Sequence, residues 1–152
     1  MLSEDFEDFL KLLNQYQVQY LVVGGYAMAF HGKPRFTGDL DVWINISEDN
    51  ALKMVSVIND FGFASLGFTY KDFSKPNLIN QIGYPPLRID ILTSIDGVGF
   101  EEAYSEKLEI QLDEGTSVFY IGLAELIKNK KSSGRKIDIA DVSDLEKKRK
   151  NN

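Results

Sequence analysis

Hydrophobic residues recur at helical spacing early in the chain and in strict alternation further on, which predicts helices packed against a sheet. Residues 3–17 carry apolar side chains three or four positions apart behind a serine that can cap a helix, so we expect an amphipathic helix there. Residues 18–23 are a β-branched and aromatic run, typical of a buried strand. Gly24-Gly25 ends this run, and a short helix is expected over residues 26–30.

Two later segments alternate between polar and apolar residues, as strands with one face against a core do. Residues 39–46 place Asp39 and Asp41 on one face and aliphatic side chains on the other. Residues 87–92 repeat the pattern and place Asp90 in a strongly apolar setting. A buried aspartate is costly unless it has a partner. Asp90 is therefore expected to lie beside the first two aspartates.

The rest of the chain continues the mixture of helices and strands. Further helices are expected over residues 47–61, 100–105, 122–131 and 137–150. Further strands are expected over residues 64–69, 77–82, 107–112 and 118–121. In the helix over residues 47–61, the side chains of Leu52, Val55 and Ile58 are expected to face inward.

Composition and length limit the class of protein. The 152 residues are 43% hydrophobic and 26% charged, which is typical of one globular domain over residues 1–152. We expect its core over about 18–121 and a C-terminal helical pair over about 122–150. The N-terminal residues do not resemble a signal peptide, and no apolar run reaches membrane-span length, so we expect a cytoplasmic protein without membrane contact.

Cysteine, histidine and charge exclude several kinds of site. The absence of cysteine excludes disulfides, thiol nucleophiles and thiolate metal sites, and a single histidine makes a histidine-rich metal site untenable. The net charge of −6 disfavours a simple RNA-binding module. Basic residues nevertheless gather between residues 128 and 150, where they either contact RNA or nucleotide phosphates or form a solvated helix face.

The candidate chemistry lies between the first strand and the second. Because residues two apart share a strand face, Asp39 and Asp41 would repel each other unless a cation neutralises them, and Mg²⁺ or Mn²⁺ prefers such oxygen ligands. Gly24-Gly25 precedes a helix start, where backbone N–H groups can receive a phosphate. Arg35 either binds a substrate phosphate or forms an ordinary ion pair.

A strand, a glycine pair, thirteen intervening residues, Asp-x-Asp and a later lone aspartate follow one another in this chain. This order resembles the nucleotidyltransferase superfamily of polymerase-β-like fold. Residues 24–44 look especially like small nucleotidyltransferase-like proteins related to abortive-infection toxin nucleotidyltransferases, and residues 123–145 are similar to the closing segment of that group. The resemblance implies an α/β (α+β) fold with a mixed central sheet, flanking helices and a C-terminal helical pair.

The resemblance also implies a function. Asp39, Asp41 and Asp90 would be the catalytic residues and would bind Mg²⁺ or Mn²⁺ for transfer of a nucleotide from an NTP to an RNA, protein or small-molecule hydroxyl. The residues implied to contact the nucleotide are Gly24, Gly25, Arg35, Thr37, Lys128 and Lys131. A toxin–antitoxin component with a cognate partner would fit the same group.

Two alternatives remain open at this stage. Many active members have Gly-Ser where this chain has Gly24-Gly25, so the chain lacks a hydroxyl that helps to hold the phosphate. The protein could therefore be a catalytically inactive member that acts as a nucleotide-binding or partner-binding module. The three acids could also form ordinary ion pairs with Arg35, Arg88 or lysines.

Overall fold

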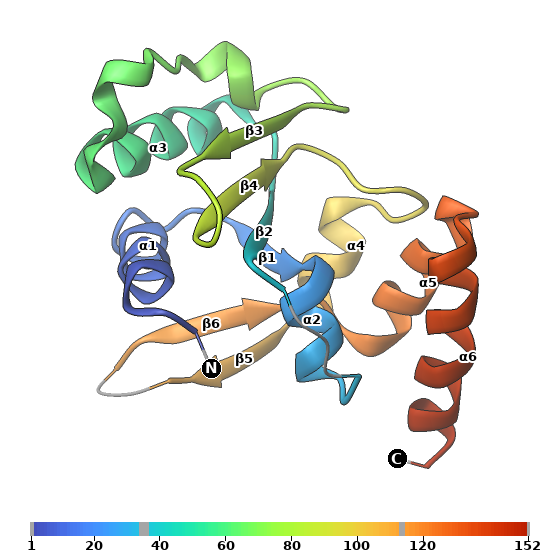
Figure 1. The fold of residues 1–152 in the computed structure, drawn as a ribbon. Helices are drawn as coiled ribbons and strands as arrows, with labels where there is room; N and C mark the ends of the chain where they lie inside the picture. The colour runs from blue at the N-terminus through green and yellow to red at the C-terminus, as the bar shows by residue number, and fades with distance from the viewer. Residues whose placement is uncertain (1, 34–36, 113–114, 152) are drawn as a thin grey trace.

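The computed structural model describes residues 2–33, 37–112 and 115–151. The described residues form a six-stranded sheet in the order β3-β4-β2-β1-β6-β5 (Figure 1). Its strands are β1 (Tyr20–Val23), β2 (Asp39–Ile44), β3 (Ile79–Ile82), β4 (Arg88–Leu92), β5 (Leu108–Gln111) and β6 (Ser117–Tyr120). The α-helices are α1 (Glu4–Gln15), α2 (Gly24–Phe30), α3 (Glu48–Ile58), α4 (Phe100–Ser105), α5 (Leu123–Ser133) and α6 (Lys136–Lys150).

The sheet is mixed. The β1–β6 and β2–β4 pairs are parallel, and the β1–β2, β3–β4 and β5–β6 pairs are antiparallel. Figure 1 shows α5 and α6 side by side at one end of the molecule, away from α1 and α3. The expected α/β fold with a mixed sheet, flanking helices and a C-terminal helical pair is therefore confirmed.

The N-terminal helix α1 forms for the reasons visible in its sequence. The Ser3 hydroxyl accepts a hydrogen bond from the Phe6 N–H at 3.2 Å, and the first turn is acidic, which suits the positive end of the helix dipole. Its buried side chains recur every three or four residues and are Phe6, Phe9, Leu10 and Leu13. These side chains belong to the hydrophobic core, and α1 packs against β6 and α3.

The helix α3 buries part of the face expected for it: Ile58 is fully buried, and Val55 is partly buried against the core. Its apolar buried side chains are Ala51, Met54, Val57 and Ile58. The expectation that Leu52 faces inward is wrong, because this side chain is 51% exposed. Each residue turns a helix by about 100°, so the stripe that contains Ala51 and Met54 leaves the intervening Leu52 on another side.

Asn50 on α3 ties together the start of β1 and the end of β2. Its side chain is buried, accepts the Gln19 N–H at 2.8 Å, and donates to the carbonyls of Gln19 at 3.1 Å and Asn45 at 2.7 Å. We expect Asn50→Leu to lower the free energy of unfolding by about 2–3 kcal/mol, because it leaves buried backbone groups without partners. Urea unfolding would measure this. The exposed Asn59→Ala should change little, and an equally small effect at Asn50 would contradict the role.

The segment between α3 and β3 differs from the expectation of two strands. The strand expected over residues 77–82 is present as β3, but the strand expected over residues 64–69 is wrong. That part of the chain forms short π- and 3₁₀-helical turns instead. Gly62 and Gly67 have φ angles of 105° and 71°, which an extended strand does not accommodate.

The C-terminal pair is joined at Gly134, which ends α5 in the left-handed conformation with a φ angle of 69°. The buried residues of α6 are Asp138, Asp141 and Leu145. Because two of these three are acidic, α6 is attached to the domain largely through charge pairing and little through an apolar stripe. None of the helices in the described part of the chain has the length and apolar character that crossing a bilayer requires.

Candidate active site

The three aspartates singled out in the sequence lie on two adjacent strands. The strands β2 and β4 are parallel, with Asp41 directly opposite Asp90 and Asp39 opposite Arg88. Because residues two apart share a face of a strand, all three carboxylates lie on the same face of the sheet. The structure thus brings together Asp39, Asp41 and Asp90, which are far apart in sequence.

Arg88 lies on the same face and bonds two of these three carboxylates. Its Nη2 donates to Asp39 Oδ2 at 2.8 Å, and its Nε donates to Asp90 Oδ1 at 2.9 Å. A further bond of 3.1 Å joins Nη2 to Asp90 Oδ2. The ordinary ion pairing left open in the sequence is therefore present for Asp39 and Asp90. One guanidinium offsets only one of the negative charges, so the group as a whole remains acidic.

Asp41 occupies the least favourable position of the three. Burial and the charges of Asp90 and Asp39 together raise its pKa to about 7, although the positive charges of Arg88 and Lys130 act in the opposite direction. Gly24 lies directly against it, since a Cβ there would lie 2.0 Å from Asp41 Oδ2, and its φ angle is +67°. The positive charges of Arg88 and Lys130 therefore compensate only part of the cost of ionising Asp41.

Thr37 lies beside the second glycine of the pair. A Cβ on Gly25 would lie 2.7 Å from Thr37 Oγ1, and this hydroxyl donates to the Asp39 carbonyl at 3.2 Å. Gly24, Gly25 and Thr37 thus lie together at the start of α2, next to the carboxylates. Arg35, the other predicted phosphate contact in this loop, lies outside the described residues.

A cavity of about 500 Å³ opens beside Asp41. The wall near the carboxylates includes Gly24, Asp41, Lys130 and Arg135. A phosphorylated ligand could enter this end, because backbone without side chains and two cationic groups meet there.

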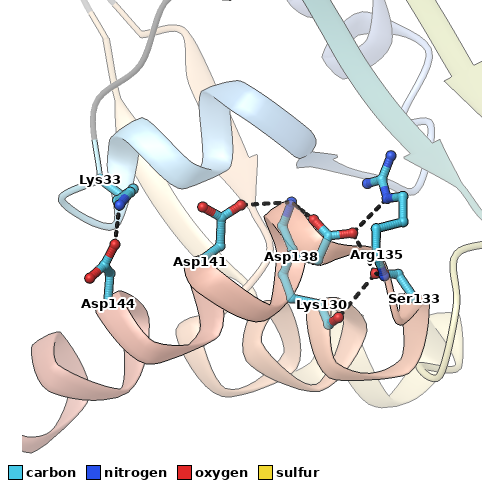
Figure 2. A network of polar contacts seen from close by, with 7 residues as sticks. All are labelled: Lys33, Lys130, Ser133, Arg135, Asp138, Asp141 and Asp144. Carbon is cyan, nitrogen blue, oxygen red and sulfur yellow. Dashed lines mark hydrogen bonds and ion pairs between the residues drawn. The ribbon is translucent and has the colours of Figure 1, made fainter.

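Lys130 lines the cavity and also belongs to a buried polar network on α5 and α6, which Figure 2 shows. Its Nζ donates to Asp138 Oδ1 at 2.9 Å and lies 3.7 Å from Asp141 Oδ2. Asp138 also accepts hydrogen bonds from Arg135 Nε at 2.6 Å and from the Ser133 hydroxyl. Burial alone would raise the pKa of Asp138, but the bonds from Ser133, Lys130 and Arg135 outweigh it and lower that pKa to about 2.

The two lysines that the resemblance implied as nucleotide contacts lie elsewhere. Lys128 pairs with Glu102 at 3.0 Å, and Lys131 pairs with Glu146 at 2.6 Å. Among the described residues, the cavity wall includes Lys130 and neither of these lysines. Lys130 was missed because the three cations look alike in composition. The helical phase of Leu126 and Ile127, three or four positions earlier on the buried face of α5, was the signal that could have distinguished Lys130.

The donor set suits a hard divalent cation, although the side chains are not arranged around one. Within the described residues, no group of three or more acidic, histidine or cysteine side chains has the arrangement of a metal site. Asp39 and Asp90 are instead turned toward the Arg88 guanidinium. Carboxylates on one sheet face, with a deep member short of positive charge, match the chemistry of Mg²⁺ or Mn²⁺. A cation bound by all three would take over the place of Arg88.

Comparison with known proteins adds to this geometry. No family model matches the chain, and no curated protein matches it significantly. The crystal structure of an antigenic nucleotidyltransferase-like protein from Paracoccidioides brasiliensis matches with a TM-score of 0.54 and 14% identity, over 95% of this chain and 77% of that chain. A nucleotidyltransferase candidate from Thermotoga maritima matches with a TM-score of 0.43 and 15% identity, over 95% of this chain and 88% of that chain. The first of these matches shows that the chain has the fold of nucleotidyltransferase-like proteins.

Proposed function

We propose that this protein is a divalent-metal-dependent nucleotidyltransferase that moves a nucleotide from an NTP to a hydroxyl group. One observation carries the proposal: Asp41 faces Asp90 across adjacent strands, its charge is only partly compensated, and it borders a cavity with Lys130 in its wall. Three neighbouring carboxylates repel one another and lower the stability of the folded protein, which a purely structural role does not require. Their charge becomes useful when a cation joins them and a triphosphate enters the cavity.

Each residue of the site has its own role in the proposed reaction. Asp39, Asp41 and Asp90 would hold Mg²⁺, which when bound offsets their charge and that of the transferring phosphate. Gly24, which has no side chain, lets its backbone lie directly against Asp41, and Lys130 would present an ammonium group to the phosphates. The acceptor oxygen forms a bond to the α-phosphorus, the bond from that phosphorus to the bridging oxygen breaks, and pyrophosphate leaves. The hydroxyl proton passes to a carboxylate of the site.

The acceptor and the setting belong to the same proposal. We take the acceptor to be a hydroxyl of an RNA, a protein or a small molecule. A toxin–antitoxin role with a cognate partner rests on the resemblance of residues 24–44 and 123–145 to the abortive-infection group.

A second candidate function is a catalytically inactive module that binds a nucleotide or a partner. The observation that favours it is the Arg88 guanidinium between Asp39 and Asp90, which stabilises these carboxylates without a metal. The two candidates differ in whether metal binding changes the affinity for NTP.

Calorimetric titration of each NTP, with and without Mg²⁺, separates the candidates. The proposed enzyme should bind NTP in a metal-dependent way and release pyrophosphate slowly, and Asp39→Asn/Asp41→Asn should lose both. Asp49→Asn is the matched control, because this exposed acid pairs with Lys53 on α3. Metal-independent NTP binding that survives the double substitution would favour an inactive nucleotide-binding module. No NTP binding at all would contradict the transferase and favour the partner-binding module.

A further inference from the structure

The cavity beside Asp41 extends along the sheet to an end that the proposed chemistry does not use. On β4, Leu92 follows Asp90 by two residues and so shares its face, and on β3, Ile79 lies opposite Leu92. Both side chains line the cavity, on the same side of the sheet as the carboxylates. A strand rises about 3.3 Å per residue, so Leu92 lies about 7 Å along the strand from Asp90.

Ile79 is one of several large apolar residues that are exposed in this molecule. It lies on the edge strand of the sheet and is 62% exposed, although it is a large aliphatic side chain. Together with the half-buried Leu92 it gives the far end of the cavity an apolar floor. Ligand pockets combine such a floor with a few polar groups that fix orientation. A flat, aromatic ligand group fits that description better than a phosphate does.

The first polar group at this end is Asn77. Its φ angle of 65° is in the left-handed region, which asparagine adopts more readily than most residues other than glycine. Ser94 holds it there, because the serine hydroxyl accepts the Asn77 N–H at 2.8 Å and donates to Asn77 Oδ1 at 3.1 Å. These bonds use the oxygen of the side-chain amide, and its NH₂ group keeps two donors for a ligand.

The second polar group is Asp96, on the loop that follows β4 and extends toward α5 in Figure 1. The backbone of this loop is fixed against α5: the Asp96 carbonyl accepts Asn129 Nδ2 at 3.0 Å, and a Cβ on Gly97 would lie 1.9 Å from Ser132 Oγ. Within the described chain, no residue pairs with the Asp96 carboxylate. An acceptor-only group is therefore held at the cavity rim with its oxygens available.

We propose that this end of the cavity is the base subsite of the NTP, and that Asp96 and Asn77 select guanine. This inference rests on the proposed function and deepens it. Guanine presents two neighbouring donors, N1–H and the 2-amino group, which match the two oxygens of a carboxylate, and its O6 accepts from an amide such as that of Asn77. Ile79 and Leu92 would lie against the plane of the base.

The other bases match this rim less well. Adenine places the unprotonated N1 beside its amino group, and uracil flanks its one N–H with two carbonyls, so each turns an acceptor toward the carboxylate. Cytosine offers an amino group next to an unprotonated ring nitrogen. A carboxylate that meets an acceptor loses its hydration without gaining a partner, which makes rejection stronger than a mere loss of contact.

Calorimetric titration of GTP, ATP, CTP and UTP with Mg²⁺ into the full chain tests the inference. Wild type should bind GTP about 10-fold or more tightly than the other three. Asp96→Asn should weaken GTP binding by about 10- to 100-fold and change the affinity for the other NTPs by less than about 3-fold. Asn77→Gly, which suits the left-handed backbone, should lower GTP affinity by a smaller factor.

The outcomes separate the inference from the proposed function. Equal binding of all four NTPs, or a GTP preference that Asp96→Asn leaves unchanged, would overturn the guanine subsite and leave the transferase standing. No NTP binding to wild type would overturn both. Thermal unfolding of Asp96→Asn should match that of wild type, because the side chain is exposed, and this excludes loss of fold as a cause of weaker binding.

Discussion

Replacement of Asp41 by asparagine is expected to abolish nucleotide transfer, by about 10³-fold or more, and to make the protein more stable. The folded state raises the pKa of this carboxyl from 3.8 to about 7 through burial and the charges of Asp90 and Asp39. Between these values the folded chain keeps a proton that the unfolded chain has lost. Stability therefore falls as pH rises through this window and stays lowered above about pH 7.

Asparagine does not ionise, so Asp41→Asn should show no such fall. Its advantage over wild type should grow from near zero at pH 4 to about 1–3 kcal/mol at pH 8, measured by urea unfolding at a series of pH values without metal. Saturating Mg²⁺ should stabilise wild type more than the variant. Asp39→Asn is the comparison, since it breaks the pair with Arg88 while relieving only part of the repulsion at Asp41, and its gain should be smaller than that of Asp41→Asn. Equal stability of Asp41→Asn and wild type at pH 8 would contradict the electrostatic account.

Replacement of Lys130 by methionine is expected to lower the free energy of unfolding by about 3–5 kcal/mol. Methionine keeps most of the volume of the lysine side chain but removes the charge that faces Asp138 and Asp141, both of which are buried. Those two carboxylates would then lie in the interior with less positive charge to offset them. Because the buried residues of α6 are largely these acids, the helix should detach first, as loss of amide protection over α6 would show.

Two controls make the Lys130 prediction specific. Lys128→Met removes an exposed partner of Glu102 and should cost less than about 1 kcal/mol. The Asp138 pKa, lowered to about 2, adds stability above about pH 4 that is lost as pH falls toward 2. Without Lys130 this acid dependence should become weaker. A Lys130→Met protein as stable as Lys128→Met would mean that the pair contributes little to the attachment of α6.

The parts of the fold that sequence predicted well are those with a regular period. Alternation identified β2 and β4 and placed their acids on one face, and the cost of an isolated aspartate pointed Asp90 toward the other two. Period does not decide how the strands pair or which way the side chains turn. The bonds from Arg88 to Asp39 and Asp90 therefore remained one of several open pairings until the register was known.

The residues at the far end of the cavity could not be predicted from the sequence, for a different reason. It is built from Asn77, Ile79 and the loop around Asp96, which belong to segments without a clear hydrophobic period. The backbone there depends on single bonds such as Ser94 to Asn77, and the exposed face of β3 depends on its place at the sheet edge. Such features come from tertiary contacts and leave little trace in local composition.

The strand order also determines when this protein acquires its site during synthesis on the ribosome. β1 lies between β2 and β6, and its Val22 carbonyl accepts the Ile121 N–H at 3.1 Å. The pairing of β1 therefore cannot be completed until β6, which is synthesised much later, is available. Lys130 and its partner Asp138 emerge later still. A nascent chain that ends before α5 carries the three aspartates and Arg88 but lacks Lys130 in the cavity wall. The complete site would therefore form only after α5 and α6 have left the ribosome.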